Sequence, residues 1–304
     1  MSVYHAGSRA LQDQVGVRDR ADHVGRSLGQ DIKPVAAAFL EQQPLLIVGG
    51  PDPGTGRVWA HALTGTPGFV RATGPRRVSV HTAHAFGRGT TVGTIALDPR
   101  TRRRMRVNGR LTPTATGFTV DADQVFANCP RYIQRRESYE TVDRSPGVSR
   151  HLTGLGDEEA EFVRAADTFF LATVNAAGAD ASHRGGNPGF VQVASPRELS
   201  WPDYPGNAMF LSLGNLYADP RAGLLFLDWE TGSTLQLTGE ARTGFAEDGT
   251  RTVRFTLTEA LWTPNALPLR WSAPEYSPAN PPARALTSAH ATETEGGGLR
   301  RVRP

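Results

Sequence analysis

Hydrophobic and polar residues alternate in several short stretches of this sequence, which is the pattern of half-buried β-strands. Residues 104–108, 234–238 and 253–257 show it most clearly. In the first of these stretches, Met105 and Val107 would share one face, and the polar residues beside them would share the other. The alternation therefore predicts strands that turn one face to a core and the other to solvent.

Two short amphipathic helices are also predicted, and each precedes an apolar strand. The first has its apolar positions at Ile32, Val35, Phe39 and Leu40 and is followed by a strand over 44–48. In the second, Asp157 can cap the helix, with acidic residues in the first turn, where the helix dipole favours them. A strand over 168–174 follows it.

The same order of sequence blocks occurs twice, which indicates an internal repeat. The matching pairs are 39–48 with 162–171, PGFV at 67–70 with PGFV at 188–191, 92–110 with 222–241, and 118–130 with 255–267. Because the offsets between the blocks change only slowly, we predict a tandem duplication of a unit of roughly 100 residues.

The predicted fold is mainly β with short helices, arranged as two six-stranded barrels. A closed barrel removes exposed sheet edges, and the 33 glycines and 22 prolines favour many turns. We predict an N-terminal arm (1–30), a first barrel copy (31–136), a second barrel copy (157–276) and a mobile tail (277–304).

Composition narrows the class of protein. Hydrophobic residues make up 38% and charged residues 21%, as in soluble globular chains, and the net charge is +3. No apolar run reaches the ~18–20 residues of a membrane helix, and the N-terminus lacks a signal-peptide core. The single cysteine excludes an internal disulfide. We therefore predict a cytoplasmic protein that binds neither membranes nor nucleic acid.

Three local motifs favour structural explanations. GGPDPGTG (49–56) lacks the Lys-Ser/Thr of a phosphate-binding loop, so a hairpin turn is predicted. His81 and His84 have no carboxylate or thiol at a suggestive spacing, so no metal site is predicted. Cys129 is not part of a Cys-His pattern that would indicate a reactive thiol, which favours a buried, inert side chain.

The densest charged cluster comprises Arg100, Arg102, Arg103, Arg104 and Arg106. On a strand, alternate arginines would share one face. Three interpretations stay open for that face: a solvated or carboxylate-paired surface, which we favour, local phosphate binding, and contact with nucleic acid.

Potential ligand groups gather in the second copy. SHRGGNPGFV (182–191) sets an arginine among small residues, and Asn207, Ser212, Gly214 and Asn215 surround the start of a short predicted helix, which suits an anion. The first copy has Leu63 where the second has Arg184, and it lacks the segment WPDYPGNAM. Only the second copy is therefore predicted to hold a complete phosphate site.

These blocks resemble the pyridoxamine 5′-phosphate oxidase-like flavoproteins, the flavin-binding split β-barrels. The resemblance rests on LATVNAAGADASHRGG, PGFV and SLGNLYADPRAGLLFLDWETGSTLQLTGEA within about 160–245, and on NCPRYIQRR (128–136). It implies two split barrels face to face as a pseudo-dimer, with flavin mononucleotide (FMN) in the groove between them. Whether the duplicated chain forms a further homodimer stays open.

The resemblance also implies roles for individual residues. Arg184 and Ser182 would hold the flavin phosphate, Ser212, Leu213 and Asn215 would meet phosphate and ring, and Gln236 would face the ring. Asn128 and Tyr132 would approach from the first copy. Gly214 departs from the family, in which an arginine or lysine is frequent. The full predicted cofactor-binding set is Ser182, His183, Arg184, Gly185, Asn207, Ser212, Leu213, Asn215, Gln236, Asn128 and Tyr132.

The sequence thus predicts an FMN-binding flavoprotein, an oxidoreductase that acts on a small organic molecule. No His-Asp or Cys-His arrangement suggests a catalytic acid or nucleophile, so no catalytic residue is assigned. Two alternatives remain: a deazaflavin-dependent reductase on the same fold, and a non-catalytic flavin- or haem-binding module.

Overall fold

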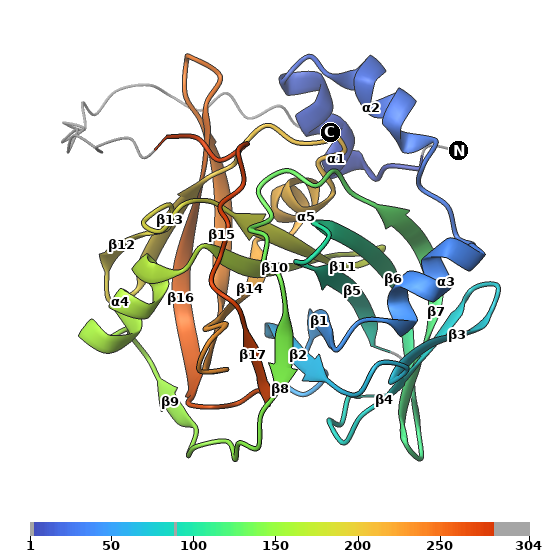
Figure 1. Cartoon of the computed structure of the whole chain (residues 1–304). Helices are drawn as coiled ribbons and strands as arrows, with labels where there is room; N and C mark the ends of the chain where they lie inside the picture. Colours follow the sequence, from blue (N-terminus) through green and yellow to red (C-terminus); the bar gives the residue numbers. More distant parts are fainter. Residues whose placement is uncertain (1–2, 88–89, 283–304) are drawn as a thin grey trace.

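A computed structural model describes residues 3–87 and 90–282 of the chain (Figure 1). In this part the helices are α1 (Ala6–Gln14), α2 (Arg18–Gly25), α3 (Pro34–Glu41), α4 (Asp157–Ala165) and α5 (Leu211–Ala218). The strands of the first half are β1 (Leu45–Pro51), β2 (Val58–Thr64), β3 (Val70–Gly74), β4 (Arg77–His81), β5 (Thr91–Asp98), β6 (Arg103–Thr114) and β7 (Gly117–Ala127). The linking strands are β8 (Tyr139–Thr141) and β9 (Arg150–Leu152). Those of the second half are β10 (Thr168–Asn175), β11 (Gly178–Gly185), β12 (Gln192–Ser195), β13 (Glu198–Pro202), β14 (Arg221–Leu227), β15 (Thr234–Phe245), β16 (Arg251–Thr263) and β17 (Leu269–Trp271).

Two antiparallel sheets with the same strand order form the body of the molecule. The first runs β2-β1-β5-β6-β7-β4-β3, and the second runs β11-β10-β14-β15-β16-β13-β12, with β9 added beside β16. The mainly β, two-barrel fold predicted from the sequence is confirmed, although each sheet has seven strands along this path where we predicted six. An identical order is what a duplication would produce, and the duplication itself stays a prediction.

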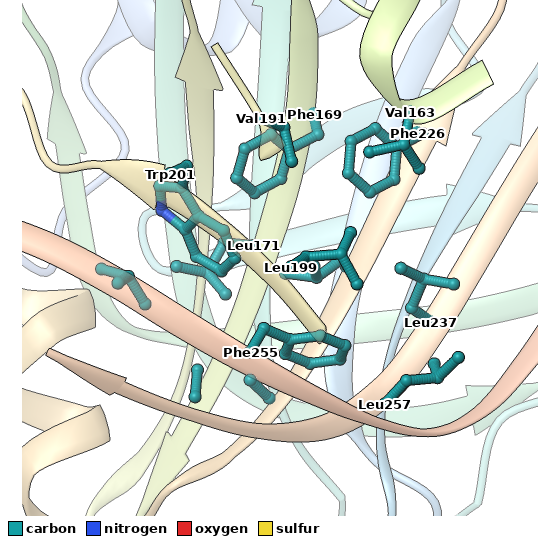
Figure 2. Packing of buried hydrophobic residues seen from close by; sticks show 14 of the residues in the cluster. Val163, Phe169, Leu171, Val191, Leu199, Trp201, Phe226, Leu237, Phe255 and Leu257 are labelled. Atoms are coloured by element: carbon teal, nitrogen blue, oxygen red, sulfur yellow. The ribbon is translucent and has the colours of Figure 1, made fainter. Parts of the chain in front are cut away.

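Each sheet encloses its own apolar core. In the second unit, Phe169, Trp201, Phe226 and Phe255 are almost fully buried and pack with aliphatic residues of five strands (Figure 2). At ~25 cal/mol per Å² of apolar surface, aromatic side chains of this size contribute much of the stability of a core.

A third apolar cluster joins the two sheets across their faces. Ile47 and Ile95 from the first sheet and Phe170 and Leu225 from the second are all 0% exposed. The central strands are therefore buried on both faces, which explains their uninterrupted apolar sequences. The backbones also approach closely: a Cβ on Gly93 would lie 2.2 Å from the Ala181 nitrogen, so this position admits only glycine.

The predicted N-terminal arm is a helical hairpin that packs on the second unit. Helix α1 packs against α5, and α2 packs against α1 (Figure 1). A Cβ on Gly214 would lie 2.4 Å from the Ser8 Oγ, so the departure from the family at this position coincides with the packing of α1. Ser8 also donates a hydrogen bond to the Phe210 carbonyl (3.2 Å), and Gln12 donates one to the Met209 carbonyl (2.9 Å).

The remaining local predictions have mixed outcomes. The hairpin turn predicted over 49–56 is present between β1 and β2 at residues 52–57, closed by the Asp52 amide donating to the Arg57 carbonyl, and residues 49–51 belong to β1. Helix α4 begins one residue earlier than predicted, because Gly156 is the N-cap and its amide donates to the Glu159 carboxylate. Most of the predicted mobile tail lies outside the described residues. In the described part, no helix is both long and apolar enough to cross a membrane.

Candidate functional site

The groove between the two units contains a cavity of about 250 Å³, which we name the arginine pocket. Its walls are strand β6 of the first unit, strand β11 of the second, the segment after β7 and the segment between β13 and α5. The charged residues that line it are Arg20, Arg104, Arg106, Arg131, Arg184, Arg251 and Asp203. Six arginines and one carboxylate make it strongly cationic.

On the polar face of β6, Arg106 is buried and Arg104 is partly buried, so this face is not solvated. The carboxylate pairing that our favoured interpretation also allowed is found at Arg106. Strand β6 packs against β11, and Arg106 donates through Nη1 to both carboxylate oxygens of Asp180 (3.0 and 2.9 Å). Asn108 and Ser212 also donate to Asp180 (3.0 and 2.7 Å). This carboxylate therefore compensates the charge of one buried arginine.

Arg104 has no such compensation. Its Nη1 lies 2.8 Å from the Nδ1 of His183, and within the described residues it makes no ion pair. Burial, together with the charges of Arg106 and Arg184, lowers the pKa of Arg104 to about 9. The same burial, together with these three arginines, holds the pKa of His183 well below its usual value. His183 is therefore neutral, accepts at Nδ1 and keeps its proton on Nε2.

Several buried polar atoms in this pocket lack a hydrogen-bond partner among the described residues. The donors are the Nε atoms of Arg104, Arg106 and Arg184 and the Nε2 of His183. Buried donors without partners are costly, at ~1–3 kcal/mol each. An anion with several oxygen acceptors, such as a phosphate, would satisfy a donor set of this kind.

Arg184 has a carboxylate partner within the protein. Its Nη1 donates to the Asp203 Oδ1 (2.7 Å), and Arg251 donates to the Oδ2 of the same carboxylate (2.8 Å). Asp203 is thus shared by two arginines, and the Nε of Arg184 is still without a partner. Arg184 can contact a ligand without leaving Asp203 unpaired.

Aromatic side chains and a strained backbone form the opposite wall. The Tyr132 and Tyr204 rings lie 5.1 Å apart, and the Tyr132 hydroxyl donates to the Pro205 carbonyl (3.0 Å). Tyr132, Ala208 and Phe210 all have left-handed backbone angles, with φ of 65°, 64° and 54°. Such strain persists only where surrounding contacts enforce it, and the bonds from α1 to residues 209 and 210 do so here.

The structure brings most of the predicted site residues to this pocket. Those that line it are Asn128, Tyr132, His183, Arg184, Gly185, Asn207, Ser212 and Leu213. Ser182 and Asn215 do not line it: the Ser182 hydroxyl donates to the Leu171 carbonyl (3.3 Å), and the Asn215 amide donates to Thr173 (3.0 Å). Gln236 lies in a second cavity.

Sequence reasoning missed several residues of the arginine pocket. Arg104 and Arg106 belong to a cluster for which we favoured a solvated or carboxylate-paired surface. Arg106 is paired with a carboxylate, but we did not predict that the two arginines line a pocket. Cys129, which we expected to be buried, is exposed and lines the pocket because it lies in the segment that leaves β7. Arg20 comes from α2 and donates to the Gly206 carbonyl (3.2 Å). No sequence pattern predicts this contact.

The second cavity, of about 330 Å³, also lies between the two units, and we name it the histidine pocket. Strand β2 of the first unit provides Trp59 and His61, and strand β15 of the second provides Gln236. His84 and Phe86 close one side, with ring centroids 4.6 and 5.5 Å from that of His61.

The two pockets occupy corresponding places in the two units. In β1, Leu46 pairs with Leu63 of β2, and in β10, Phe169 pairs with Arg184 of β11. By the same registers, Asp180 corresponds to Trp59, and Arg104 and Arg106 correspond to Thr234 and Gln236. Three arginines of the arginine pocket, Arg104, Arg106 and Arg184, therefore have uncharged counterparts.

The comparisons with known proteins identify the second half of the chain. Residues 155–293 match the family model described as pyridoxamine 5′-phosphate oxidase, which confirms the predicted resemblance. The match does not include the first sheet. No curated protein matches the sequence.

Among solved structures, one similar protein is a candidate pyridoxamine 5′-phosphate oxidase from Lactobacillus delbrueckii, with 17% identity, a TM-score of 0.30, and coverage of 36% of this chain and 94% of that chain. An FAD-binding protein from Mesorhizobium loti has 11% identity and a TM-score of 0.29, covering 39% of this chain and 99% of that one. An FAD-binding protein from Mycobacterium smegmatis has 14% identity and a TM-score of 0.27, covering 38% and 98%.

Proposed function

Because residues 155–293 match the family model described as pyridoxamine 5′-phosphate oxidase, we propose that the chain is a flavoprotein of this family that binds FMN in the arginine pocket and acts as an oxidoreductase on a small organic molecule. The observation that carries the proposal is Arg104, a partly buried cation whose Nε is buried and without a partner and which has no carboxylate of its own among the described residues.

The donor set suits a phosphate better than a carboxylate. Arg104 and Arg106 come from the first unit, and His183 and Arg184 come from the second, so the four side chains surround the cavity from two sides. A phosphate has enough acceptor oxygens to meet several of these donors at once, and a phosphate ester is the anionic part of FMN. Both units would then contribute to one cofactor site.

The remaining walls suit a flat ring system. Tyr132, Tyr204 and Phe210 supply aromatic surface, and Leu211 and Leu213 supply aliphatic surface. The cavity volume of about 250 Å³ lies just below the range of ~300–1,000 Å³ for ligand pockets. Part of a ligand as large as FMN would therefore extend into the open groove, where a substrate could reach it.

When bound, the flavin would supply the redox chemistry, and the protein would supply binding and orientation. Burial raises the pKa of Tyr132 and of Tyr204, so both phenols are protonated at neutral pH and can donate hydrogen bonds. Asp203 is held by two arginines and Asp180 by one, so neither carboxylate is available as a base. The residues that line the pocket would thus position the flavin and exclude water from it.

The absorption spectrum of the purified protein and the mass of the released cofactor test the proposal. Flavin maxima and the mass of FMN would support it, a single near-ultraviolet peak would indicate a deazaflavin, and a Soret band would indicate haem. Anaerobic bleaching by reduced nicotinamide cofactors would support catalysis. A protein that binds no added FMN would refute the assignment.

Substitution of Arg104 tests the site itself. We expect Arg104→Ala to weaken FMN binding by about 2–4 kcal/mol, or ~30- to 700-fold, because it removes a desolvated charge from the phosphate. Riboflavin, which lacks the phosphate, should lose little. Arg103→Ala is the matched control, because Arg103 is the exposed neighbour on the same strand. Equal losses for both ligands in Arg104→Ala would contradict the phosphate assignment.

A further inference from the structure

The proposed cofactor does not use the histidine pocket. The lining of this pocket has more acidic than basic side chains, whereas the arginine pocket is strongly cationic. Arg57 is its sole arginine among the described residues, and it is paired with Glu259. Glu259 also contacts His151 (2.8 Å), and the Asp52 carboxylate accepts from the amide and hydroxyl of Thr55 (2.8 and 2.7 Å). With one arginine against two carboxylates, the lining offers nothing that would offset the desolvation of an anion.

The two histidines nearest the cavity are uncharged at neutral pH. Burial lowers the pKa of His61 to about 3, and the neighbouring His84 contributes in the same direction. Burial also lowers the pKa of His84. Because neither imidazole is protonated, the pocket gains no positive charge from them, and a phosphorylated ligand is disfavoured here.

The aromatic groups create a surface for a flat ring. The centroids of His84 and Phe86 lie 4.5 Å apart, both close to His61, and Phe86 is supported from behind by Phe118 (5.1 Å). Trp59 adds a further ring to the lining. Aromatic pairs of this kind favour ring ligands through offset and edge contacts.

A hydrogen-bond donor and an acceptor lie next to each other beside these rings. The Gln236 amide donates to the Ala60 carbonyl (2.8 Å) and contacts the Nδ1 of His61 (3.2 Å). Both hydrogens of the amide nitrogen are therefore committed, and its Oε1 is left as an acceptor. His61 accepts at Nδ1, so its proton is on Nε2, where it can be donated.

From this combination we propose that the histidine pocket is a second ligand site, which binds an uncharged, planar heteroaromatic molecule bearing adjacent hydrogen-bond donor and acceptor groups. Its volume of about 330 Å³ lies within the range for small-molecule sites. The arginine pocket selects for a phosphate, and the histidine pocket selects against one. The chain then holds two different ligands at two corresponding places.

Calorimetric titration with lumichrome tests the proposal, because this uncharged tricyclic ring carries adjacent N–H and carbonyl groups and no phosphate. The titration is run at pH 6.5 on the protein alone and on protein saturated with FMN. We expect one equivalent of lumichrome to bind to the FMN-saturated protein, in which FMN occupies the arginine pocket, and at least one equivalent to bind to the protein alone. Binding should quench tryptophan fluorescence, and inorganic phosphate should not compete.

Two independent variants and one matched control locate the binding. His61→Ala removes the donor and Gln236→Leu removes the acceptor, and each should weaken lumichrome binding about tenfold, the value of a lost hydrogen bond. Arg104→Ala should leave it unchanged. The proposal is overturned if lumichrome does not bind, if FMN or Arg104→Ala abolishes its binding, or if neither His61→Ala nor Gln236→Leu weakens it. Because FMN binding is measured separately, this result does not depend on the cofactor assignment.

Discussion

The arginine pocket and the histidine pocket occupy corresponding places in two sheets of identical strand order, yet they differ in almost every charged position. Arg104, Arg106 and Arg184 of the arginine pocket correspond in register to Thr234, Gln236 and Leu63. The backbone frame is thus compatible with either chemistry. A few side chains decide whether a pocket attracts an anion or excludes it.

Burying a cationic face has structural consequences that the uncharged pocket avoids. Arg106 needs the buried carboxylate of Asp180, and Asp180 in turn needs Asn108 and Ser212. The counterpart of Asp180 is Trp59, which needs no ion pair. The arginine pocket therefore depends on a polar network in which each member leaves another unsatisfied when it is removed.

The largest effect is expected from breaking that network at Asp180. Asp180→Ala leaves Arg106 buried and unpaired, so we expect a loss of about 3–5 kcal/mol in the free energy of unfolding. Urea denaturation followed by circular dichroism measures it. The control is Asp123→Ala, because Asp123 is 52% exposed and lies 3.8 Å from Arg110, a surface pair that contributes ~0–1 kcal/mol. Similar losses in the two variants would show that the network is not a stabilising feature of the pocket.

A smaller effect is expected from Arg184→Ala. Arg184 shares Asp203 with Arg251, so its removal leaves that carboxylate paired and the fold little changed. We expect FMN to bind about five- to thirtyfold more weakly, which is less than for Arg104→Ala because Asp203 already offsets part of the charge.

Riboflavin distinguishes the two roles open to Arg184. If Arg184 binds the phosphate, the riboflavin affinity should barely change. If Arg184 only supports the segment around Asp203, both affinities should fall together and the melting temperature should fall with them. The second outcome would leave Arg104 and Arg106 as the phosphate residues and remove Arg184 from the site.

The elements of the fold could be predicted because local patterns determine them. Alternation located β6, β15 and β16, and the GGPDPGTG segment identified the hairpin after β1. The repeat of blocks anticipated two sheets. Eight of the site residues that the family resemblance implied line one cavity, because the resemblance covers the order of the sequence blocks that the fold places around that cavity.

The burial of Arg104 and Arg106 could not be predicted from the same patterns. Alternation shows that two faces of a strand differ, but it does not show that the polar face meets a second sheet instead of water. The contact of α1 with Gly214 could not be predicted either, since Gly7 and Gly214 are more than 200 residues apart and neither helix of the hairpin has a distinctive motif. Both features depend on tertiary packing between distant segments.

The smallest expected effect concerns the uncharged state of the histidine pocket. The pKa of His61 is lowered to about 3 in the folded protein, against 6.5 for an unperturbed histidine, so the unfolded chain binds a proton more readily. Stability should therefore be fully present above pH 6.5 and decline as the pH falls from 6.5 toward 3. The full shift would cost about 2 kcal/mol at pH 5, and we expect about half of that because His61 keeps some contact with solvent.

Urea denaturation at pH 7.5 and pH 5 measures the decline, and His61→Gln should reduce it by about 1 kcal/mol. The decline that persists in His61→Gln reports the other groups, including His183, whose pKa is lowered in the same direction. A wild-type protein equally stable at both pH values would show that His61 becomes charged without cost, and the contrast between the two pockets would then vanish under mildly acidic conditions.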